Sequence, residues 1–510
     1  MERIYITTPL YYVNAEPHLG HTYTTVVADT LKRYYRSIGY DAFLLTGTDE
    51  HGDKIAQAAA ANGTEPKAYA DRVSDLFRLT WDECGIAYDH FIRTTDDYHV
   101  RYVQSVLQKI YDADDIYFGE YGGLYCYGCE RFYTEKELVG GKCPDHQTVP
   151  EYISEKNYFF RMSKYQEQLI DALQSRRDLV RPEQYRAEVL AFLREPLEDL
   201  CISRPTSRLQ WGISLPFDSN YVTYVWFDAL LNYVSALEHR GGDSLSSLWP
   251  TANHLIAKDI LKPHAIYWPT MLMAAGLPLY QHLNVHGYWN MDSGKMSKSL
   301  GNVIRPLEMK ARFGMDAFRY FLLRDMAFGQ DAKFSEEALI TRYNADLANN
   351  LGNFVSRALT MQQKYFDGVV QPFGASSASE DVKLKDQFAA AEFDVKTRME
   401  ELQFHRALEA IWWALDHANR YVVQTAPFTM IKEAEKKARV GEVLHHLLEV
   451  VRSLARVLPP FMPDTAVELR NLLAIDDAGL KAPWGKGFVS GHQVNPPKNL
   501  FPRIETEAKK

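Results

Sequence analysis

The sequence has little cysteine, no long apolar run and no excess of positive charge. Its 510 residues include five cysteines, too few for a disulfide framework. No uninterrupted apolar segment could cross a bilayer, and the first residues lead straight into a strand-like run without a secretory signal pattern. We therefore expect a cytoplasmic protein that does not bind membranes. The net charge of −9 does not indicate nucleic-acid binding, although a large protein can still concentrate basic residues on one face.

The length and the order of predicted elements indicate several domains, since 510 residues exceed what one compact core accommodates. Strands that alternate with helices favour a parallel sheet, whose ligands bind at the carboxyl ends of the strands. We expect strands at 4–8, 42–46, 253–257 and 282–286, and helices at 20–38 and 54–62.

Two other regions have a different character. Residues 116–215 are rich in Tyr, Gly, Cys and Pro, carry short strand-like runs, and are expected to form an insertion. Beyond about residue 340, apolar residues recur at spacings of three and four, which predicts a helical bundle. Its helices are expected at 338–365, 380–400, 403–423, 434–457 and 463–473.

Two short motifs far apart in the sequence carry groups suited to binding phosphate. The run HLGH at 18–21 places two imidazoles at the predicted start of a helix, where N–H groups and the helix dipole favour anions. The run KMSKS at 295–299 lies between glycines at 294 and 301 and places two ammonium groups on a loop. Each motif alone also fits a helix cap or a solvated basic turn. Their occurrence together, each after a predicted strand, favours a functional pair.

The charges of these motifs suit attack at the α-phosphorus of a triphosphate. His18 and His21 are expected to hydrogen-bond the α-phosphate region, and Lys295 and Lys298 to neutralise the departing pyrophosphate. A substrate carboxylate serves as the nucleophile, so the protein contributes mostly positioning and electrostatics. Magnesium is expected to accompany the ATP phosphates, held chiefly by substrate oxygens and water.

Three of the five cysteines cluster in the expected insertion. Cys126 and Cys129 form one half-site, and Cys143 with His146 forms a second, which is the spacing of a zinc knuckle. Four protein ligands leave no open position, so we expect one structural zinc per chain. Asp145 is the alternative to His146 as the fourth ligand. Buried free thiols and a redox pair are competing interpretations, but a redox pair leaves the second half-site unexplained.

Together the two phosphate motifs resemble the HIGH and KMSKS signatures of class I aminoacyl-tRNA synthetases. The surrounding residues resemble the methionyl-tRNA synthetase family rather than its valyl, isoleucyl or cysteinyl relatives, over essentially the whole chain. The segments that carry this resemblance are TTPLYYVN at 7–14 with Pro17-His18, TDEHG at 48–52, ISR at 202–204, YVWFDA at 224–229, KDI at 258–260 with His264, and LFPRI at 500–504.

The resemblance implies an α/β fold: a Rossmann-like parallel-sheet catalytic domain, split by a zinc-binding insertion and followed by an all-α anticodon-binding bundle. It implies an AMP-forming methionine–tRNA ligase, which makes methionyl-adenylate from methionine and ATP and then charges the 3′ adenosine of tRNA-Met, initiator and elongator. The expected boundaries are 1–115 for the first catalytic half, 116–215 for the insertion with the zinc knuckle, 216–305 for the second catalytic half with the KMSKS loop, 306–345 for a linker or stem-contact region, and 346–510 for the anticodon-binding domain.

The resemblance also implies roles for individual residues. Without it, Trp226 and Tyr233 fit ordinary core packing, Asp49 a strand-end cap, and Arg204 a surface ion pair. With it, Asp49 holds the substrate ammonium, Arg204 supports the site electrostatically, and aromatic walls suit a soft thioether. The implied methionine pocket consists of Leu10, Tyr12, Asp49, Trp226, Leu230, Tyr233 and His264. The implied ATP site consists of His18, Gly20, His21, Asp259, Lys295, Ser297 and Lys298.

The helical end is implied to read the tRNA anticodon. Asn353 and Arg357 are four residues apart on one predicted helix face, so both can point at one unstacked base. The family commonly has Trp at a third contact, whereas this chain has Phe428, which keeps a stacking surface and loses the indole donor. Some relatives add a C-terminal β-barrel that binds tRNA and dimerises. The sequence ends soon after Ile504, so we expect a monomer.

Four alternatives account for less of the sequence. An insertion of about 100 residues leaves no room for the editing domain of leucyl, isoleucyl or valyl enzymes. Cysteinyl enzymes grip the substrate thiolate with zinc, whereas the cysteines here sit together in the insertion. A nucleotidyltransferase that makes an adenylate without tRNA would not need the helical third of the chain. A zinc-knuckle RNA-binding protein, the non-enzyme alternative, would leave Lys295 and Lys298 without a role.

Overall fold

The computed structural model describes residues 2–128, 131–133, 135–144, 147–291, 303–374 and 378–505. The chain divides into two compact units. Unit 1 comprises residues 1–29 and 39–286, and unit 2 comprises residues 30–38 and 287–510. Across the described residues, no helix combines the length and the apolar character needed to span a membrane.

A parallel sheet lies at the centre of unit 1, as the alternating strands and helices predicted. Its strand order is β2–β3–β1–β13–β14–β8, and β4 also pairs with β3. Strands β1 and β13 are almost wholly buried, which is typical of parallel strands covered on both faces. The strands are β1 (Arg3–Thr7), β2 (Tyr11–Tyr12), β3 (Asp41–Asp49), β4 (His90–Arg93), β8 (Val180–Arg181), β13 (Ala252–Ala257) and β14 (His282–His286).

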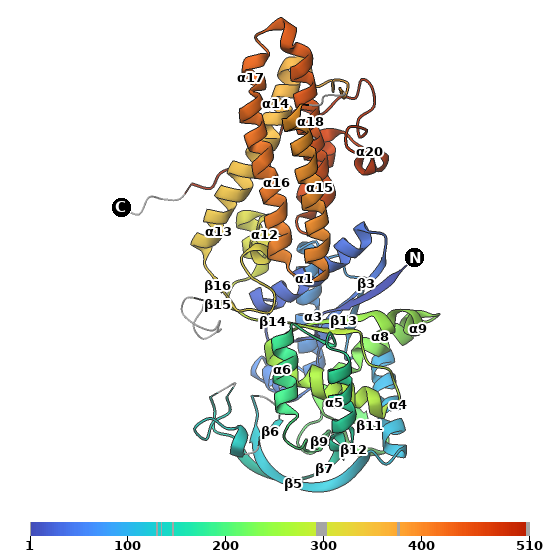
Figure 1. Cartoon of the computed structure of the whole chain (residues 1–510). Coiled ribbons are helices and arrows are strands. Elements are labelled where there is room, and N and C mark those ends of the chain that lie inside the picture. Colours follow the sequence, from blue (N-terminus) through green and yellow to red (C-terminus); the bar gives the residue numbers. More distant parts are fainter. Residues whose placement is uncertain are drawn as a thin grey trace. The chain divides into compact units, whose positions relative to one another are not determined.

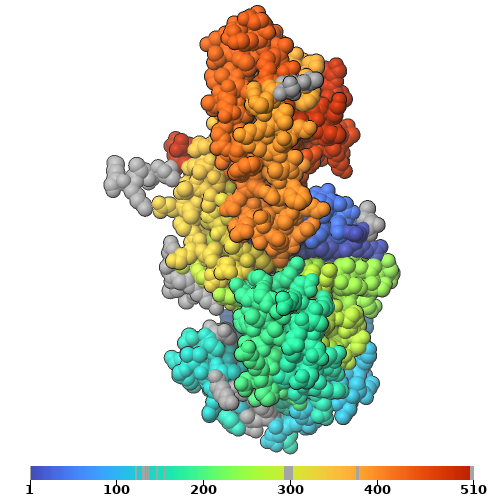
Figure 2. All heavy atoms as spheres, viewed as in Figure 1, coloured from blue at the N-terminus to red at the C-terminus, as the bar shows by residue number. Residues whose placement is uncertain are grey.

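Helices connect these strands and bury one large apolar cluster against the sheet. The first, α1 (Leu19–Ser37), belongs to unit 1 as far as Asp29 and to unit 2 beyond it. It starts inside the HLGH run and ends before Gly39, whose φ of +96° favours glycine. Helices α5 and α6 lie side by side (Figure 1), within the continuous green surface of Figure 2. The remaining helices of unit 1 are α2 (Asp53–Ala61), α3 (Pro66–Glu83), α4 (Asp97–Asp112), α5 (Gln166–Ser175), α6 (Glu183–Phe192), α7 (Val225–Leu230), α8 (Asn232–Arg240), α9 (Ser244–Leu248) and α10 (Trp268–Ala274).

Antiparallel sheets make up much of the segment expected as an insertion. Strands β5 (Ile116–Cys126) and β7 (Glu151–Phe160) form a long curved ribbon (Figure 1), extended by β6 (Arg131–Tyr133) and β9 (Leu200–Cys201). A smaller sheet has the order β10–β12–β11, with bounds Ser203–Pro205, Asp218–Thr223 and Ser214–Leu215. The short strand β8 also comes from this segment, yet it pairs in parallel with β14 and so belongs to the central sheet.

Unit 2 is mainly helical, which confirms the predicted bundle. Its long helices α14, α15, α16 and α18 run alongside one another (Figure 1). The helix expected at 338–365 is observed as α13, a π-helical segment Tyr343–Gly352, and α14. The helices are α11 (Pro306–Phe313), α12 (Met315–Arg324), α13 (Glu336–Arg342), α14 (Asn353–Phe366), α15 (Ser379–Glu400), α16 (Phe404–Thr425), α17 (Pro427–Met430), α18 (Lys437–Val457), α19 (Pro463–Leu473) and α20 (Asp477–Lys481). Strands β15 (Trp289–Met291) and β16 (Ala332–Phe334) form a short parallel pair.

Candidate active site

The carboxyl ends of β1, β3 and β13 bring three distant segments of unit 1 together. Strand β1 lies between the other two, with Thr7 opposite both Leu45 of β3 and His254 of β13. The chain after β1 continues into β2, where Tyr12 lies opposite Asp49 at the end of β3. Asp49 is 8% exposed, and the exposed Asp259 follows β13 in a short 3₁₀ turn. Residues implied to bind methionine and a residue implied to bind ATP therefore both lie at this edge of the sheet.

The two histidines of the HLGH run stack on each other at the start of α1. Their ring centroids are 3.8 Å apart, and burial together with the neighbouring His18 holds the pKa of His21 well below its usual value. The backbone N–H of Gly20 donates to Nδ1 of His18 at 3.1 Å, and that of His18 points at Nδ1 of His21 at 3.4 Å. Because Nδ1 accepts an N–H bond in each ring, a proton lies on Nε2. A side chain at Gly20 would crowd His18, because an added Cβ would lie 3.2 Å from the ring.

Three aromatic and imidazole groups implied to bind methionine contact one another. The Tyr233 hydroxyl lies 2.8 Å from Nε2 of His264, and the Trp226 ring stands edge-on to His264 with centroids 6.1 Å apart. Nδ1 of His264 donates to the carbonyl oxygen of Ile260 at 3.0 Å, so the Tyr233 hydroxyl donates to the neutral imidazole. Leu230 is buried in the same apolar cluster as Tyr233, and Leu10 packs against that cluster.

A π-helical segment, Pro263–Tyr267, holds His264 in this position. The hydroxyl of Tyr280 donates to the carbonyl oxygen of His264 at 3.1 Å, which fixes the wider turn from outside. π-Helical turns occur frequently at functional sites. Sequence patterns gave no sign of this segment, since five residues are too few for a periodic signal.

Arg204 is buried rather than at the surface, with 2% of its area exposed. Its guanidinium lies over the rings of Tyr125 and Tyr224, 5.1 and 5.2 Å from their centroids. One of its nitrogens also donates to the carbonyl oxygen of Ser203 at 2.7 Å. Arg204 thus joins the strand that ends at Cys126 to the residue before α7.

A buried carboxylate beside Asp49 was not anticipated from the sequence. Both oxygens of Glu50 accept hydrogen bonds from Arg93, at 2.7 and 2.8 Å, and Thr48 and Thr95 donate to one oxygen each, at 2.7 and 2.6 Å. Glu50 is fully buried, so these bonds fix the turn that follows β3. Its place within TDEHG could have suggested a role, but Arg93 stands in no motif.

The two described cysteines of the predicted knuckle are gathered in one small cluster. Cys126 and Cys143 are 1% and 0% exposed and pack with Tyr133. The Tyr133 hydroxyl lies 3.3 Å from Sγ of Cys143. Within the described residues, no group of three metal-binding side chains is arranged around a common point. Cys129, Asp145 and His146 lie outside the described residues.

The implied anticodon residues all lie in unit 2. Asn353 is exposed at the first position of α14, Arg357 follows one turn later, and Phe428 is 48% exposed on α17. Helices α14 and α17 both pack against α18. The implied ATP residues Lys295, Ser297 and Lys298 lie outside the described residues.

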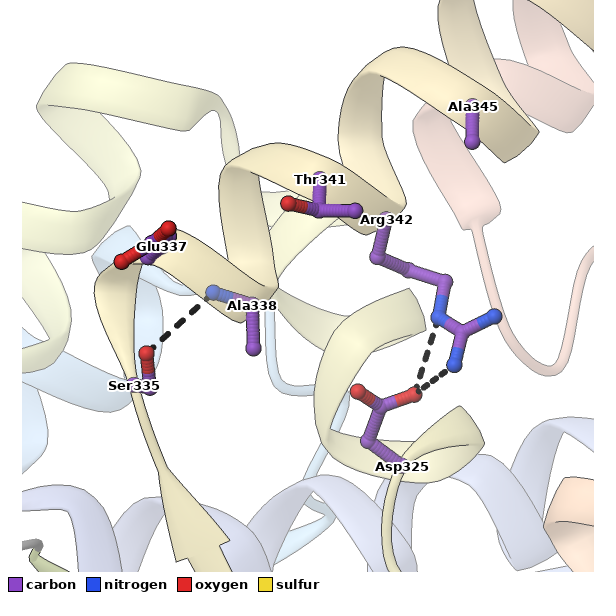
Figure 3. A pocket seen from close by; sticks show the side chains of 7 residues that line it. All are labelled: Asp325, Ser335, Glu337, Ala338, Thr341, Arg342 and Ala345. Atoms are coloured by element: carbon purple, nitrogen blue, oxygen red, sulfur yellow. Dashed lines mark hydrogen bonds and ion pairs between the residues drawn. The ribbon is translucent and has the colours of Figure 1, made fainter. Parts of the chain in front are cut away.

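An open pocket of about 460 Å³ lies beside α13 in unit 2 (Figure 3). Arg342 reaches across to Asp325 with N···O distances of 2.9 and 2.7 Å, and Ser335 caps α13 through the N–H of Ala338. Its remaining lining residues are Glu337, Thr341 and Ala345, so none of the implied site residues lines this pocket.

Comparison with known proteins defines the class first. A family model described as tRNA synthetases class I (M) matches residues 4–149 and 145–359. That match agrees with the parallel sheet, the site at the carboxyl ends of its strands and the HLGH run at a helix start. The chain is a class I aminoacyl-tRNA synthetase.

The particular family follows from the rest of the chain and from its relatives. A model for the anticodon binding domain of methionyl tRNA ligase matches residues 371–510. A methionine–tRNA ligase of Caldanaerobacter subterraneus subsp. tengcongensis is 45% identical over 507 residues, 99% of this chain and 79% of the relative. One of Thermotoga maritima is 40% identical over 513 residues, covering 99% and 81%. A solved Mycobacterium tuberculosis methionyl-tRNA synthetase in complex with methionyl-adenylate matches with a TM-score of 0.92 and 38% identity, covering 99% and 100%. The chain belongs to the methionyl-tRNA synthetase family.

The protonation of His264 predicts a pH-dependent contribution to stability. Burial lowers the pKa of His264 to about 4, below the value of about 6.5 that the unfolded chain gives it. Between about pH 4 and pH 6.5 His264 is protonated in the unfolded chain but not in the folded chain. Its contribution to the free energy of unfolding therefore rises with pH up to about 6.5 and is constant above that value. His264→Gln should remove up to about 3 kcal/mol of this rise.

Urea unfolding at pH values from about 4.5 to 7.5 measures the effect. His417→Gln, on the surface of α16 in unit 2, is the control and should leave the rise unchanged. Equal slopes for wild type and His264→Gln would contradict the assignment.

Proposed function

We propose that this chain activates methionine with ATP to methionyl-adenylate, releases pyrophosphate, and transfers the methionyl group to the 3′ adenosine of tRNA-Met. The observation that carries the proposal is similarity along the whole chain, covering 99% of it, to a relative named methionine–tRNA ligase. The solved structure with methionyl-adenylate, at 38% identity, supports the activation step. The anticodon-domain match supports the tRNA step.

We propose that His18 and His21 bind the phosphate that is attacked. Two rings with protons on Nε2 can each donate a hydrogen bond to a phosphate oxygen, and both stand at the start of α1. Gly20 leaves room for the His18 ring, and Asp259 lies on the turn tied to His264 through Ile260. Lys295 and Lys298 would neutralise the leaving pyrophosphate with Ser297 beside them, and magnesium would be held by ATP oxygens and water.

The proposed methionine pocket combines a soft wall with one buried charge. Trp226, Tyr233 and His264 offer polarisable rings to the thioether, and Leu10, Leu230 and Tyr12 complete the implied wall. Asp49 would pair with the substrate ammonium at the end of β3. A neutral His264 suits this pocket, because an uncharged side chain binds there.

Amino-acid-dependent ATP–pyrophosphate exchange tests the activation step. Purified, zinc-replete protein should exchange with methionine at least about a hundredfold faster, by kcat/KM, than with leucine, isoleucine, valine or cysteine. Exchange with another amino acid instead would agree with a class I synthetase but would contradict the proposed methionine pocket. Absence of exchange with every amino acid, in folded protein, would reject the enzyme.

We propose one structural zinc held by Cys126, Cys129 and Cys143 with His146 or Asp145. The support is the donor set: two buried sulfur atoms from separate half-sites meet in one cluster beside Tyr133. Such a metal would supply no catalytic chemistry and would stiffen the tip of the β5–β7 ribbon. Through Tyr125, the neighbour of Cys126, that ribbon contacts Arg204.

Metal analysis of a matched pair of variants tests the zinc. Wild-type protein should contain about one zinc per chain. Cys143→Ser should lose most of it, because serine oxygen is a poor zinc ligand. Cys84→Ser changes another buried thiol, 3% exposed at the end of α3, and should keep the metal. Full zinc in Cys143→Ser would contradict the assignment.

We propose that Asn353, Arg357 and Phe428 read the anticodon. Asn353 and Phe428 are exposed on unit 2, and the polar pair on α14 can hydrogen-bond one base while the ring stacks on another. The cytoplasmic location, the monomeric state and the domain boundaries given above stay predictions.

Separate assays of the two steps test the anticodon assignment. Asn353→Ala should lower kcat/KM for tRNA in aminoacylation by about tenfold or more, with pyrophosphate exchange unchanged. Asn62→Ala makes the same change at an exposed position of unit 1 and should alter neither step. Equal loss in both steps for Asn353→Ala would point to misfolding and reject the role.

A further inference from the structure

Asp228 is a buried carboxylate on α7 that the proposed chemistry does not use. It is 1% exposed. One oxygen lies 2.7 Å from Nδ1 of His51, and the other lies 2.9 Å from Nε2 of His99. His99 is itself fully buried, and its Nδ1 lies 2.8 Å from the hydroxyl of Ser235. These four side chains form one continuous hydrogen-bonded chain, here called the Asp228 chain.

The chemistry of the Asp228 chain fixes where its protons lie. A carboxylate only accepts hydrogen bonds, so the two imidazole nitrogens that face Asp228 both carry protons. The Ser235 hydroxyl, 2.8 Å from Nδ1 of His99, also lies 3.3 Å from the carbonyl oxygen of Asn232. The two imidazoles lower the pKa of Asp228 although burial opposes this, so the group stays a carboxylate.

The two imidazoles come from parts of unit 1 that are distant in sequence. His51 is separated from Asp228 by 177 residues and His99 by 129. His51 follows β3, and His99 lies on α4. Asp228 therefore ties the turn after β3 and helix α4 to helix α7, independently of any sheet hydrogen bond.

One end of the Asp228 chain contacts the proposed methionine pocket, and its central carboxylate lies on a helix that carries pocket residues. The carbonyl oxygen of His51 accepts a hydrogen bond from the Tyr12 hydroxyl at 3.1 Å. Asp49 lies two residues before His51 at the end of β3. On the other side, Trp226 and Leu230 lie on the same helix as Asp228. The turn with the proposed ammonium partner and the helix with the proposed thioether wall are thus joined through one carboxylate.

We propose that Asp228 is a positioning residue for methionine, which holds the turn after β3 and helix α7 in the spacing that the substrate needs. Neither His51 nor Asp228 is among the residues proposed to touch methionine or ATP. The inference rests on the proposed function, because it names a determinant of binding at that same site. A pocket fixed before the substrate arrives binds it without the cost of ordering, so the effect falls on methionine affinity.

Steady-state pyrophosphate exchange with Asp228→Asn tests the proposal. The amide keeps the size of the side chain, but its NH2 group faces an imidazole N–H and cannot accept from it. One of the two hydrogen bonds to the histidines is therefore lost. KM for methionine should rise about tenfold or more, and KM for ATP should change by less than about twofold. Asp316→Asn is the matched control: it changes another buried carboxylate, 6% exposed on α12, and should leave both KM values unchanged.

Two pairs of histidine variants separate positioning from general loss of stability. Asn places its amide near the position of Nδ1, and Gln places it near Nε2. His51 meets Asp228 through Nδ1, so His51→Asn should keep methionine KM closer to wild type than His51→Gln. His99 meets it through Nε2, so His99→Gln should do better than His99→Asn. A purely structural role would not move KM in this reciprocal order.

The outcomes distinguish this inference from the proposed function. The positioning role of Asp228 is supported if the wild type exchanges with methionine, if Asp228→Asn raises KM for methionine, and if the histidine pairs follow the reciprocal order. Wild-type exchange with an unchanged methionine KM in soluble Asp228→Asn overturns it and leaves the proposed function standing. If Asp228→Asn fails to fold, the histidine pairs decide by the same criterion. Absence of methionine exchange in the wild type rejects the proposed function itself.

Discussion

The parallel register of β1 between β3 and β13 is the constraint on which the site depends. A shift of one residue in either pairing would turn every side chain of β1 to the opposite face of the sheet, with Tyr5 and Thr7 leaving their present partners. The hydroxyl of Thr7 bonds Nδ1 of His254 across this register at 2.8 Å, and the N–H of Thr8 bonds the carbonyl oxygen of Leu45 at 3.0 Å. Because all three strands end at one edge, segments far apart in sequence meet there.

Several charged groups near this edge are buried and have partners that offset the loss of water. Glu50 is held by Arg93, Asp228 by two imidazoles, and Arg204 by two aromatic rings. Breaking one such buried pair by removing a single partner typically costs about 3–5 kcal/mol, because a charge stays behind without compensation. The imidazoles of His21 and His264 are instead kept neutral by burial. These two imidazoles, proposed to contact substrate, therefore carry no charge.

Much of the fold could be predicted from the sequence, because local periodicity carries it. The expected strand at 253–257 and the helices at 380–400 and 463–473 are found within a residue or two, since apolar spacing marks them and Pro463 marks the start of the last helix. The pairing of β8 with β14 could not be predicted. Two residues of strand carry no periodic signal, and their partner is about a hundred residues away.

The candidate site residues also differ in whether the sequence could predict them: those in one local motif could be predicted, and those joined by long-range contacts could not. His18, Gly20 and His21 lie within one turn, so their spacing alone suggests a shared role. The pocket residues came only from resemblance, because no spacing relates Tyr233 to His264 before the fold is known.

Neither residue spacing nor family resemblance indicated His99 or Arg93. Each acts on a partner that already stands in a matched segment, Asp228 or Glu50, and a lone buried histidine or arginine has no local pattern. Sequence and resemblance pointed mainly to residues proposed to touch substrate or zinc, whereas His99 and Arg93, which hold other residues in place, become visible only when the chain is folded. Residues that hold a binding group in place contribute to affinity as well as the group itself. A binding group that is free to move must first be ordered by the substrate, and this ordering costs free energy.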